Sequence, residues 1–207
     1  MKNPRVWMVA GLTAAAVALR VFPYMLKWAG LDAIAVGAAF PWNFSPLAAL
    51  CLFSGAYLTD RRWAFTVPLG VMLVSDVLIG VVTGQPGYYT LHPGLPFVYG
   101  SYALTILLGL ALQRHRRSPW AVGGAAFAGA VLFFVVTNFG QWLTDPLYGR
   151  SWSELIRCYT LAIPFFRNTL VGDMAYALVL FGGWAFVELR VPSLEPAGAV
   201  QRPLRGL

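Results

Sequence analysis

The sequence predicts an all-α membrane protein whose six transmembrane helices form one bundle with both termini in the cytoplasm. Three observations support this prediction. Of the 207 residues, 58% are hydrophobic and only 11% are charged, whereas about a quarter of the residues of a soluble domain are charged. The apolar residues gather in six segments that approach or exceed the length needed to cross a bilayer. Lysine and arginine concentrate in the connections on one side of these segments.

The six predicted helices cover residues 6–27, 44–59, 63–82, 96–113, 119–144 and 160–188. The second is short, and Ser45-Pro46 is typical of an N-cap followed by a first-turn proline, so we expect this helix to begin inside the membrane. The connection 28–44 would then lie over the outer mouth. Residues 1–190 form one predicted domain, and the tail 191–207, with three prolines, is predicted to be a flexible cytoplasmic end.

The basic residues give the orientation. With the N-terminus inside, the outer loops hold only Lys27, Arg150 and Arg157. The inner segments then hold Lys2, Arg5, Arg61, Arg62, Arg114, Arg116, Arg117, Arg190, Arg202 and Arg205. This asymmetry predicts a multi-pass protein of the inner (cytoplasmic) membrane. A signal peptide remains an alternative for the N-terminal segment, and its removal would leave five spans and an external N-terminus.

The fifth predicted helix ends in the stretch "FFVVTNFGQWLTDPLY", residues 133–148. Asn138, Gln141 and Asp145 are spaced by three and four residues, so they share one helical face. Asn138 and Gln141 lie in the predicted outer half of the membrane and have the aromatic neighbours Phe134 and Trp142. This combination of amide and aromatic side chains predicts contact with a ligand. Hydrogen bonding between helices is the alternative.

Other polar residues of the spans are also predicted to lie in the outer half. An ionisable residue within a span is costly unless it is paired or hydrated, so it is a candidate for function. Mutual pairing of Arg20 with Asp76, or of Arg167 with Asp173, is an equally good interpretation. The predicted ligand-binding set comprises Asn43, Asp76, Tyr99, Asn138, Gln141, Trp142, Arg167, Asn168 and Asp173.

Motifs for catalysis are absent from the sequence. It contains no P-loop, no HExxH and no GxSxG, and its two histidines lie in different loops, so we expect neither a cofactor nor a metal site. Two alternatives to a binding function stay open. One is a membrane enzyme that uses Asp76 or Asp173 on a lipid-linked substrate, and the other is a structural subunit of a larger membrane complex.

The first predicted helix carries Ala10, Ala14 and Ala18, a stripe of small residues at four-residue spacing. Small residues let a second helix approach closely. The stripe lies toward the cytoplasmic half, where a partner protein of a transporter would dock. Packing of the stripe inside the protein's own bundle is the alternative.

Five stretches resemble an uncharacterised bacterial integral-membrane family related to the S-components of energy-coupling factor (ECF) transporters. They are "NFSPLAALCLFSGAYL", "PLGVMLVSDVLIG", "FVYGSY", "FFVVTNFGQWL" and "CYTLAIPFFRNTLVGD". The resemblance implies an S-component-like fold and a subunit that captures a vitamin or cofactor precursor from outside. It also implies a transmembrane coupling protein that contacts the alanine stripe, and partner ATPases that use ATP. The start "MKNPRV" lacks the N-terminal histidine motif of metal-binding S-components, so an organic ligand is expected.

Overall fold

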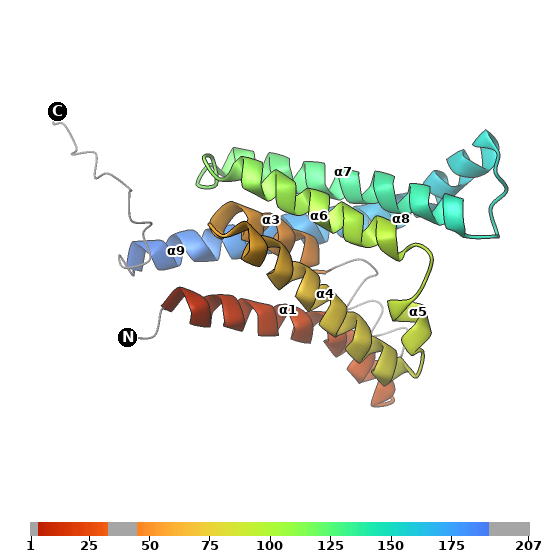
Figure 1. Cartoon of the computed structure of the whole chain (residues 1–207), viewed down its shortest axis with the longest axis horizontal. Helices are drawn as coiled ribbons and strands as arrows, with labels where there is room; N and C mark the ends of the chain where they lie inside the picture. The colour runs from red at the N-terminus through yellow and green to blue at the C-terminus, as the bar shows by residue number, and fades with distance from the viewer. Residues whose placement is uncertain (1–3, 33–44, 191–207) are drawn as a thin grey trace.

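The computed structural model describes the backbone of residues 4–32 and 45–190, and the side chains of residues 11–32, 45–87 and 89–190. Asn43, the Ala10 side chain, most of the connection 28–44 and the tail 191–207 lie outside these described parts. The helices are α1 (Pro4–Trp28), α3 (Leu47–Tyr57), α4 (Arg61–Thr83), α5 (Pro86–Thr90), α6 (Leu95–Leu112), α7 (Pro119–Thr144), α8 (Trp152–Ala177), the π-helical turn η1 (Leu178–Gly182) and α9 (Gly183–Arg190) (Figure 1). The described residues contain no strand, which confirms the predicted all-α class.

Four of the described helical segments are long and apolar enough to cross a membrane. They are α4, α6, α7 and the continuous segment Trp152–Arg190 that α8, η1 and α9 form together. α1 has 25 residues, and α3 has only 11. At 1.5 Å per residue α3 is about 16 Å long, which is too short to span the hydrocarbon core. The helix is short, as the sequence predicted, and its start within the membrane stays a prediction.

Side-chain caps define several helix ends. The Asp60 carboxylate accepts a hydrogen bond from the Arg62 amide at 2.8 Å at the start of α4, and the Ser118 hydroxyl accepts one from Ala121 at 3.4 Å at the start of α7. α4 ends at Thr83 and is followed by Gly84, whose φ of 70° is a left-handed conformation that glycine adopts without strain. Each cap satisfies a backbone group that the helix itself leaves unbonded and so stabilises the helix end. These ends lie within two residues of the predicted boundaries.

The last long helix begins eight residues before the predicted start at 160. The Ser151 hydroxyl accepts a hydrogen bond from the Glu154 amide at 3.3 Å and thereby caps α8 at Trp152. Serine followed three residues later by glutamate is the capping-box pattern of a helix start. The earlier start adds about 12 Å of helix before residue 160, so residues near the middle of α8 lie deeper in the bundle than the sequence interpretation placed them.

α3 is the centre of the fold, and its residues Leu47–Ala56 are all buried. It packs against α4, α6, α7, α8 and η1. The closest approach is to α6, where a side chain at Gly55 would overlap the carbonyl of Ile106 and a side chain at Gly109 would overlap the carbonyl of Leu52. The two glycines therefore let the backbones of α3 and α6 come into contact, as small residues do between membrane helices.

The two ends of the bundle differ in charge. Figure 1 shows that α1 begins and α9 ends at the same end as the α3–α4 and α6–α7 connections, while α5 and the α7–α8 connection lie at the other. The first end, here called the arginine-rich end, carries Arg61, Arg62, Arg114, Arg116, Arg117 and Arg190. The opposite end carries Lys27, Arg150 and Arg157. The structure thus gathers on one side the connections that were predicted to be cytoplasmic.

Candidate functional site

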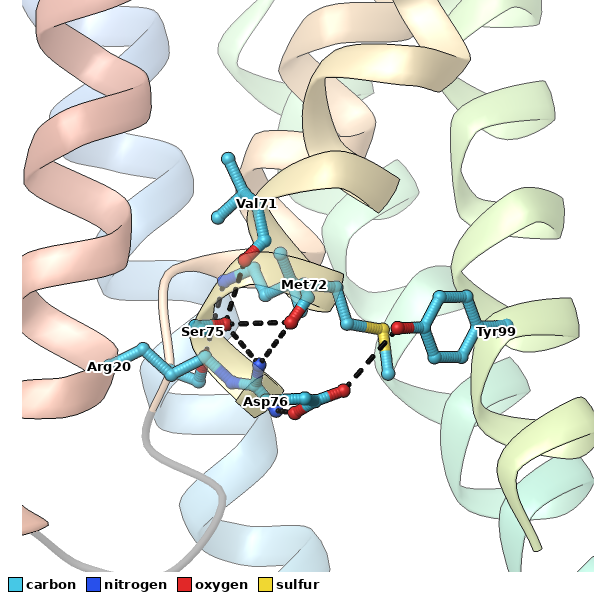
Figure 2. Close-up of polar contacts among 8 residues, drawn as sticks. Arg20, Val71, Met72, Ser75, Asp76 and Tyr99 are labelled. Carbon is cyan, nitrogen blue, oxygen red and sulfur yellow. Dashed lines mark hydrogen bonds and ion pairs between the residues drawn. The ribbon is translucent and has the colours of Figure 1, made fainter. Parts of the chain in front are cut away.

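An ion pair between α1 and α4 forms the centre of the candidate site. Arg20 Nη2 lies 2.6 Å from Asp76 Oδ1. The same guanidinium donates through Nη1 to the Met72 carbonyl at 3.1 Å and to the Ser75 hydroxyl (Figure 2). The Asp76 side chain is 4% exposed and that of Arg20 is 21% exposed. The pairing of Arg20 with Asp76 that the sequence suggested is therefore present, and Arg20 remains partly accessible.

Tyr99 on α6 extends the site to a third helix. Its hydroxyl donates to the second carboxylate oxygen, Asp76 Oδ2, over 3.4 Å (Figure 2). A contact of this length is at the weak end of hydrogen bonding. Asp76 thus receives one short, charge-assisted contact from Arg20 and one long contact from Tyr99. Because this contact is long and weak, the Tyr99 hydroxyl can exchange it for a hydrogen bond to another polar group at a small cost in free energy.

The pattern of α4 explains how these groups reach one another. The helix buries Val71, Met72, Ser75, Asp76 and Ile79, which recur with the spacing of one helical face. Ser75 donates to the Val71 carbonyl at 2.7 Å, and its oxygen also accepts from Arg20. The hydroxyl thereby links the guanidinium to the helix backbone. Sequence reasoning missed Ser75, although its place beside Asp76 on the buried face was a usable signal.

The site lies toward the end opposite the arginine-rich end. Asp76 is seven residues before the end of α4, and Tyr99 is four residues after the start of α6. By helical rise these positions are about 10 Å and about 6 Å from the helix ends. The two residues of the predicted set that the structure brings together, Asp76 and Tyr99, therefore also share a depth.

Asn138 lies in a separate groove of about 110 Å³ between α7 and α8. Its amide nitrogen donates to the Phe134 carbonyl at 2.7 Å, one turn earlier in α7. The Phe134 ring packs on Tyr159 and Phe166 with centroid distances of 5.5 and 4.9 Å. The groove is lined by Phe133, Phe134, Thr137, Asn138, Ala162, Phe165, Phe166 and Thr169. It contains Asn138 and Phe134 of the predicted amide and aromatic surface but neither Gln141 nor Trp142, and it is lined by residues of α7 and α8 alone.

Gln141 and Trp142 stabilise the end of α7. Gln141 Nε2 donates to Asp145 Oδ2 at 2.6 Å, so these two residues of the predicted polar face hydrogen-bond to each other. Trp142 donates through its indole N–H to the Gly149 carbonyl at 3.0 Å, and the Arg150 guanidinium lies 5.9 Å from the Trp142 ring. These contacts hold the α7–α8 connection against the helix and do not involve Asp76 or Tyr99.

The predicted residues of α8 are also apart from the Arg20–Asp76 ion pair. Arg167 is exposed and Asn168 is half-buried, and no ion pair joins Arg167 to Asp173 in the described part of the chain. Asp173 is 3% exposed and its Oδ2 has no hydrogen-bond partner. It adjoins a cavity of about 10 Å³ lined by Ala48, Ala49, Leu52, Thr105, Ala126 and Gly129, which is roughly the space of one water molecule.

The earlier start of α8 explains the position of Asp173. It is 21 residues from Trp152, about 32 Å along the helix. Its neighbours Ala126 and Gly129 belong to the first half of α7, the half nearer the arginine-rich end. The predicted gathering of all these polar residues at one depth is therefore incorrect for Asp173.

Around Asp76 a guanidinium, a carboxylate and a phenol meet from three helices. Within the described residues, no group of three or more His, Cys, Asp or Glu side chains is placed to hold a metal ion. No curated protein and no solved structure matches the chain. A family model matches residues 1–194, and the chain belongs to that family, the family of unknown function DUF6580.

Proposed function

We propose that this protein is the substrate-binding membrane subunit of an ECF-type transporter and captures a small organic molecule of the vitamin or cofactor-precursor class. The observation that carries the proposal is the meeting of Arg20, Asp76 and Tyr99 near the end opposite the arginine-rich end. The positive-inside rule makes that opposite end the outer one. A ligand entering from outside would find charged and hydrogen-bonding groups within about 10 Å of the helix ends.

The surface of α1 supports a role with a partner. Gly11, Ala14, Ala15 and Ala18 are exposed, whereas Ala16 is buried in the core. The stripe predicted from Ala10, Ala14 and Ala18 thus has its described members on the outside of the bundle. A transmembrane coupling protein could pack closely on this smooth surface, and partner ATPases would supply the energy from ATP.

A structural role for the same polar residues is the competing function, because Arg20 and Asp76 also join α1 to α4 directly. A membrane enzyme is less well supported. Asp173, one of its two candidate residues, is buried at a cavity of about 10 Å³, which has no room for a lipid-linked substrate.

The conservative variant Tyr99→Phe separates binding from structure. It removes only the hydroxyl whose contact with Asp76 is 3.4 Å long, so a structural role predicts little change in stability. A ligand that bonds the hydroxyl would be bound about tenfold to a hundredfold more weakly by the variant.

The experiment begins with the wild-type protein purified from its native membrane and the identification of bound small molecules by mass spectrometry. The identified compound is then titrated against wild type, Tyr99→Phe and Tyr176→Phe, a matched control on α8. Weaker binding by Tyr99→Phe alone supports the proposal. The absence of any bound compound, or equal affinity for all three proteins, contradicts it.

A further inference from the structure

A second and larger groove lies at the arginine-rich end, away from the Arg20–Asp76 ion pair. It has a volume of about 460 Å³ and runs between the start of α7 and the segment formed by α8, η1 and α9. Its lining comprises Arg116, Arg117, Ser118, Pro119, Val122, Gly123, Met174, Ala175, Ala177, Leu178, Phe181, Gly182 and Ala185. Apart from the first three, these residues are apolar, so the groove has apolar walls and a polar mouth.

Two glycines keep the groove open. A side-chain carbon added at Gly123 would contact only the end of Met174, at 3.8 Å, and one added at Gly182 would contact only Leu178, at 3.9 Å. Each position therefore has free space where another residue would place a side chain. Leu178 and Met174 are exposed along the same groove. The result is an apolar channel between α7 and the segment formed by α8, η1 and α9, which a hydrocarbon chain can fill.

The mouth of the groove is positively charged and held in place. Arg116 donates to the Ala56 carbonyl at 3.1 Å, and its guanidinium lies 4.7 Å from the Tyr57 ring. Arg117 pairs with Glu188 at 3.0 Å while its side chain remains 54% exposed. A guanidinium has five N–H donors, so the carbonyl contact leaves Arg116 able to bond an anion. The start of α7 at Ser118 adds the positive end of a helix dipole.

We propose that this groove binds an anionic phospholipid, with the phosphate at Arg116 and Arg117 and one acyl chain along Val122, Met174 and Phe181. The occupant must carry both a negative charge and a long apolar chain, because the mouth is basic and the walls are apolar. A free phosphate ion would leave the walls uncovered, and a lipid without net charge would not match the mouth. The positive-inside rule places the groove in the cytoplasmic leaflet, where anionic lipids also attract basic loops.

The lipid site is independent of the proposed transport function, since no residue of the Arg20–Asp76–Tyr99 cluster contributes to it. Its test uses the detergent-purified full chain and vesicles of phosphatidylglycerol or phosphatidylcholine. Native mass spectrometry and thermal unfolding measure lipid retention and stabilisation as each lipid is added. We expect phosphatidylglycerol to be retained and to raise the melting temperature at about a tenfold lower concentration than phosphatidylcholine. Inorganic phosphate alone should have no effect.

Two variants address the two parts of the groove. Gly123→Leu fills the channel, and Gly124→Leu is its matched control, because Gly124 is the next residue and does not line the groove. Arg116→Gln removes charge from the mouth, and Arg157→Gln at the other end is its control. Gly123→Leu and Arg116→Gln should each weaken phosphatidylglycerol binding about tenfold, and the controls should leave it unchanged.

Several results would overturn the lipid site. Equal effects of phosphatidylglycerol and phosphatidylcholine, or an equal effect of inorganic phosphate, would show that the groove selects no anionic lipid. Unaltered binding by Gly123→Leu would show that the acyl chain lies elsewhere. Because Gly123→Leu changes no charge and no hydrogen bond, its result decides the matter even if Arg116→Gln fails to fold.

Discussion

Arg20 on α1 and Asp76 on α4 form an ion pair of 2.6 Å that links these two helices directly. α1 makes its main contact with α4, so the pair fixes the helix that carries the exposed alanines. The same carboxylate receives Tyr99 from α6. A ligand bound at this cluster would therefore act directly on the position of α1, the element that we propose to meet a partner.

Breaking the pair from one side should destabilise the protein. Asp76→Val leaves the Arg20 guanidinium without its carboxylate, and removal of one partner of a buried pair costs about 3–5 kcal/mol. We expect a value near the lower limit, because the Arg20 side chain is 21% exposed. Thermal unfolding in detergent measures the loss. The double variant Arg20→Met/Asp76→Val should recover most of it, and a double variant as unstable as Asp76→Val would contradict this account.

Replacing Asp173 should stabilise the protein, whereas replacing Asp76 should destabilise it. Its Oδ2 has no hydrogen-bond partner and the cavity beside it is lined, apart from Thr105, by apolar residues, so replacing the carboxyl by an apolar group of similar shape removes a desolvation cost. We expect Asp173→Val to raise the free energy of unfolding by about 1 kcal/mol, whereas Asp76→Val lowers it. If uptake by cells is lost while stability rises, the buried carboxyl serves function. A marked drop in melting temperature would mean that Asp173 has a stabilising partner.

The contact between α3 and α6 should tolerate no side chain. A methyl group at Gly55 would overlap the Ile106 carbonyl and the Gly109 backbone, so Gly55→Ala forces two backbones apart. Overpacking of this kind costs about 1–3 kcal/mol. Gly124→Ala is the matched control, because nothing lies within 4 Å of a side chain built there. Yields and melting temperatures that are the same for both variants would show that the helices can separate at little cost.

Topology should follow the charge asymmetry of the two ends. Reporter fusions after Arg61 and Arg116 are expected to read cytoplasmic, and a fusion after Gly87, in α5 at the opposite end, should read external. A cytoplasmic signal at Gly87 would place the Arg20–Asp76 cluster on the inner side and would contradict uptake from outside through this site.

Helix positions were largely predictable from the sequence, because hydrophobic length and caps are local signals. Ser118 precedes a helix that begins at the predicted residue 119, and Asp60 precedes one that begins two residues before the predicted residue 63. The start of α8 was missed because the segment after Ser151 contains Glu154 and Arg157, and its charge lowered the hydrophobic signal although the capping box was present.

The candidate site was predictable only in part. Arg20 and Asp76 could be proposed as partners because opposite charges within a membrane attract at low dielectric. Asn138 lines a different groove and Asp173 lies at another depth. Both positions depend on how whole helices are rotated and offset against their neighbours. These quantities come from packing such as the Gly55–Gly109 contact, which no periodicity within a single helix encodes.

The exposed alanines give the most direct test of a partner. Ala14 is exposed on α1, so Ala14→Trp changes no contact in the described core and should leave the melting temperature and ligand affinity of the purified protein unchanged. If a coupling helix packs there, the indole blocks its close approach, and uptake by cells should fall at least tenfold. Ala128→Trp, at an exposed alanine of α7, is the matched control and should transport normally. Pull-down of partner proteins with the two variants shows whether the loss follows from lost association. Normal uptake by Ala14→Trp, or equal loss in both variants, would contradict docking on this face of α1, since only a partner specific to the stripe distinguishes the two tryptophans.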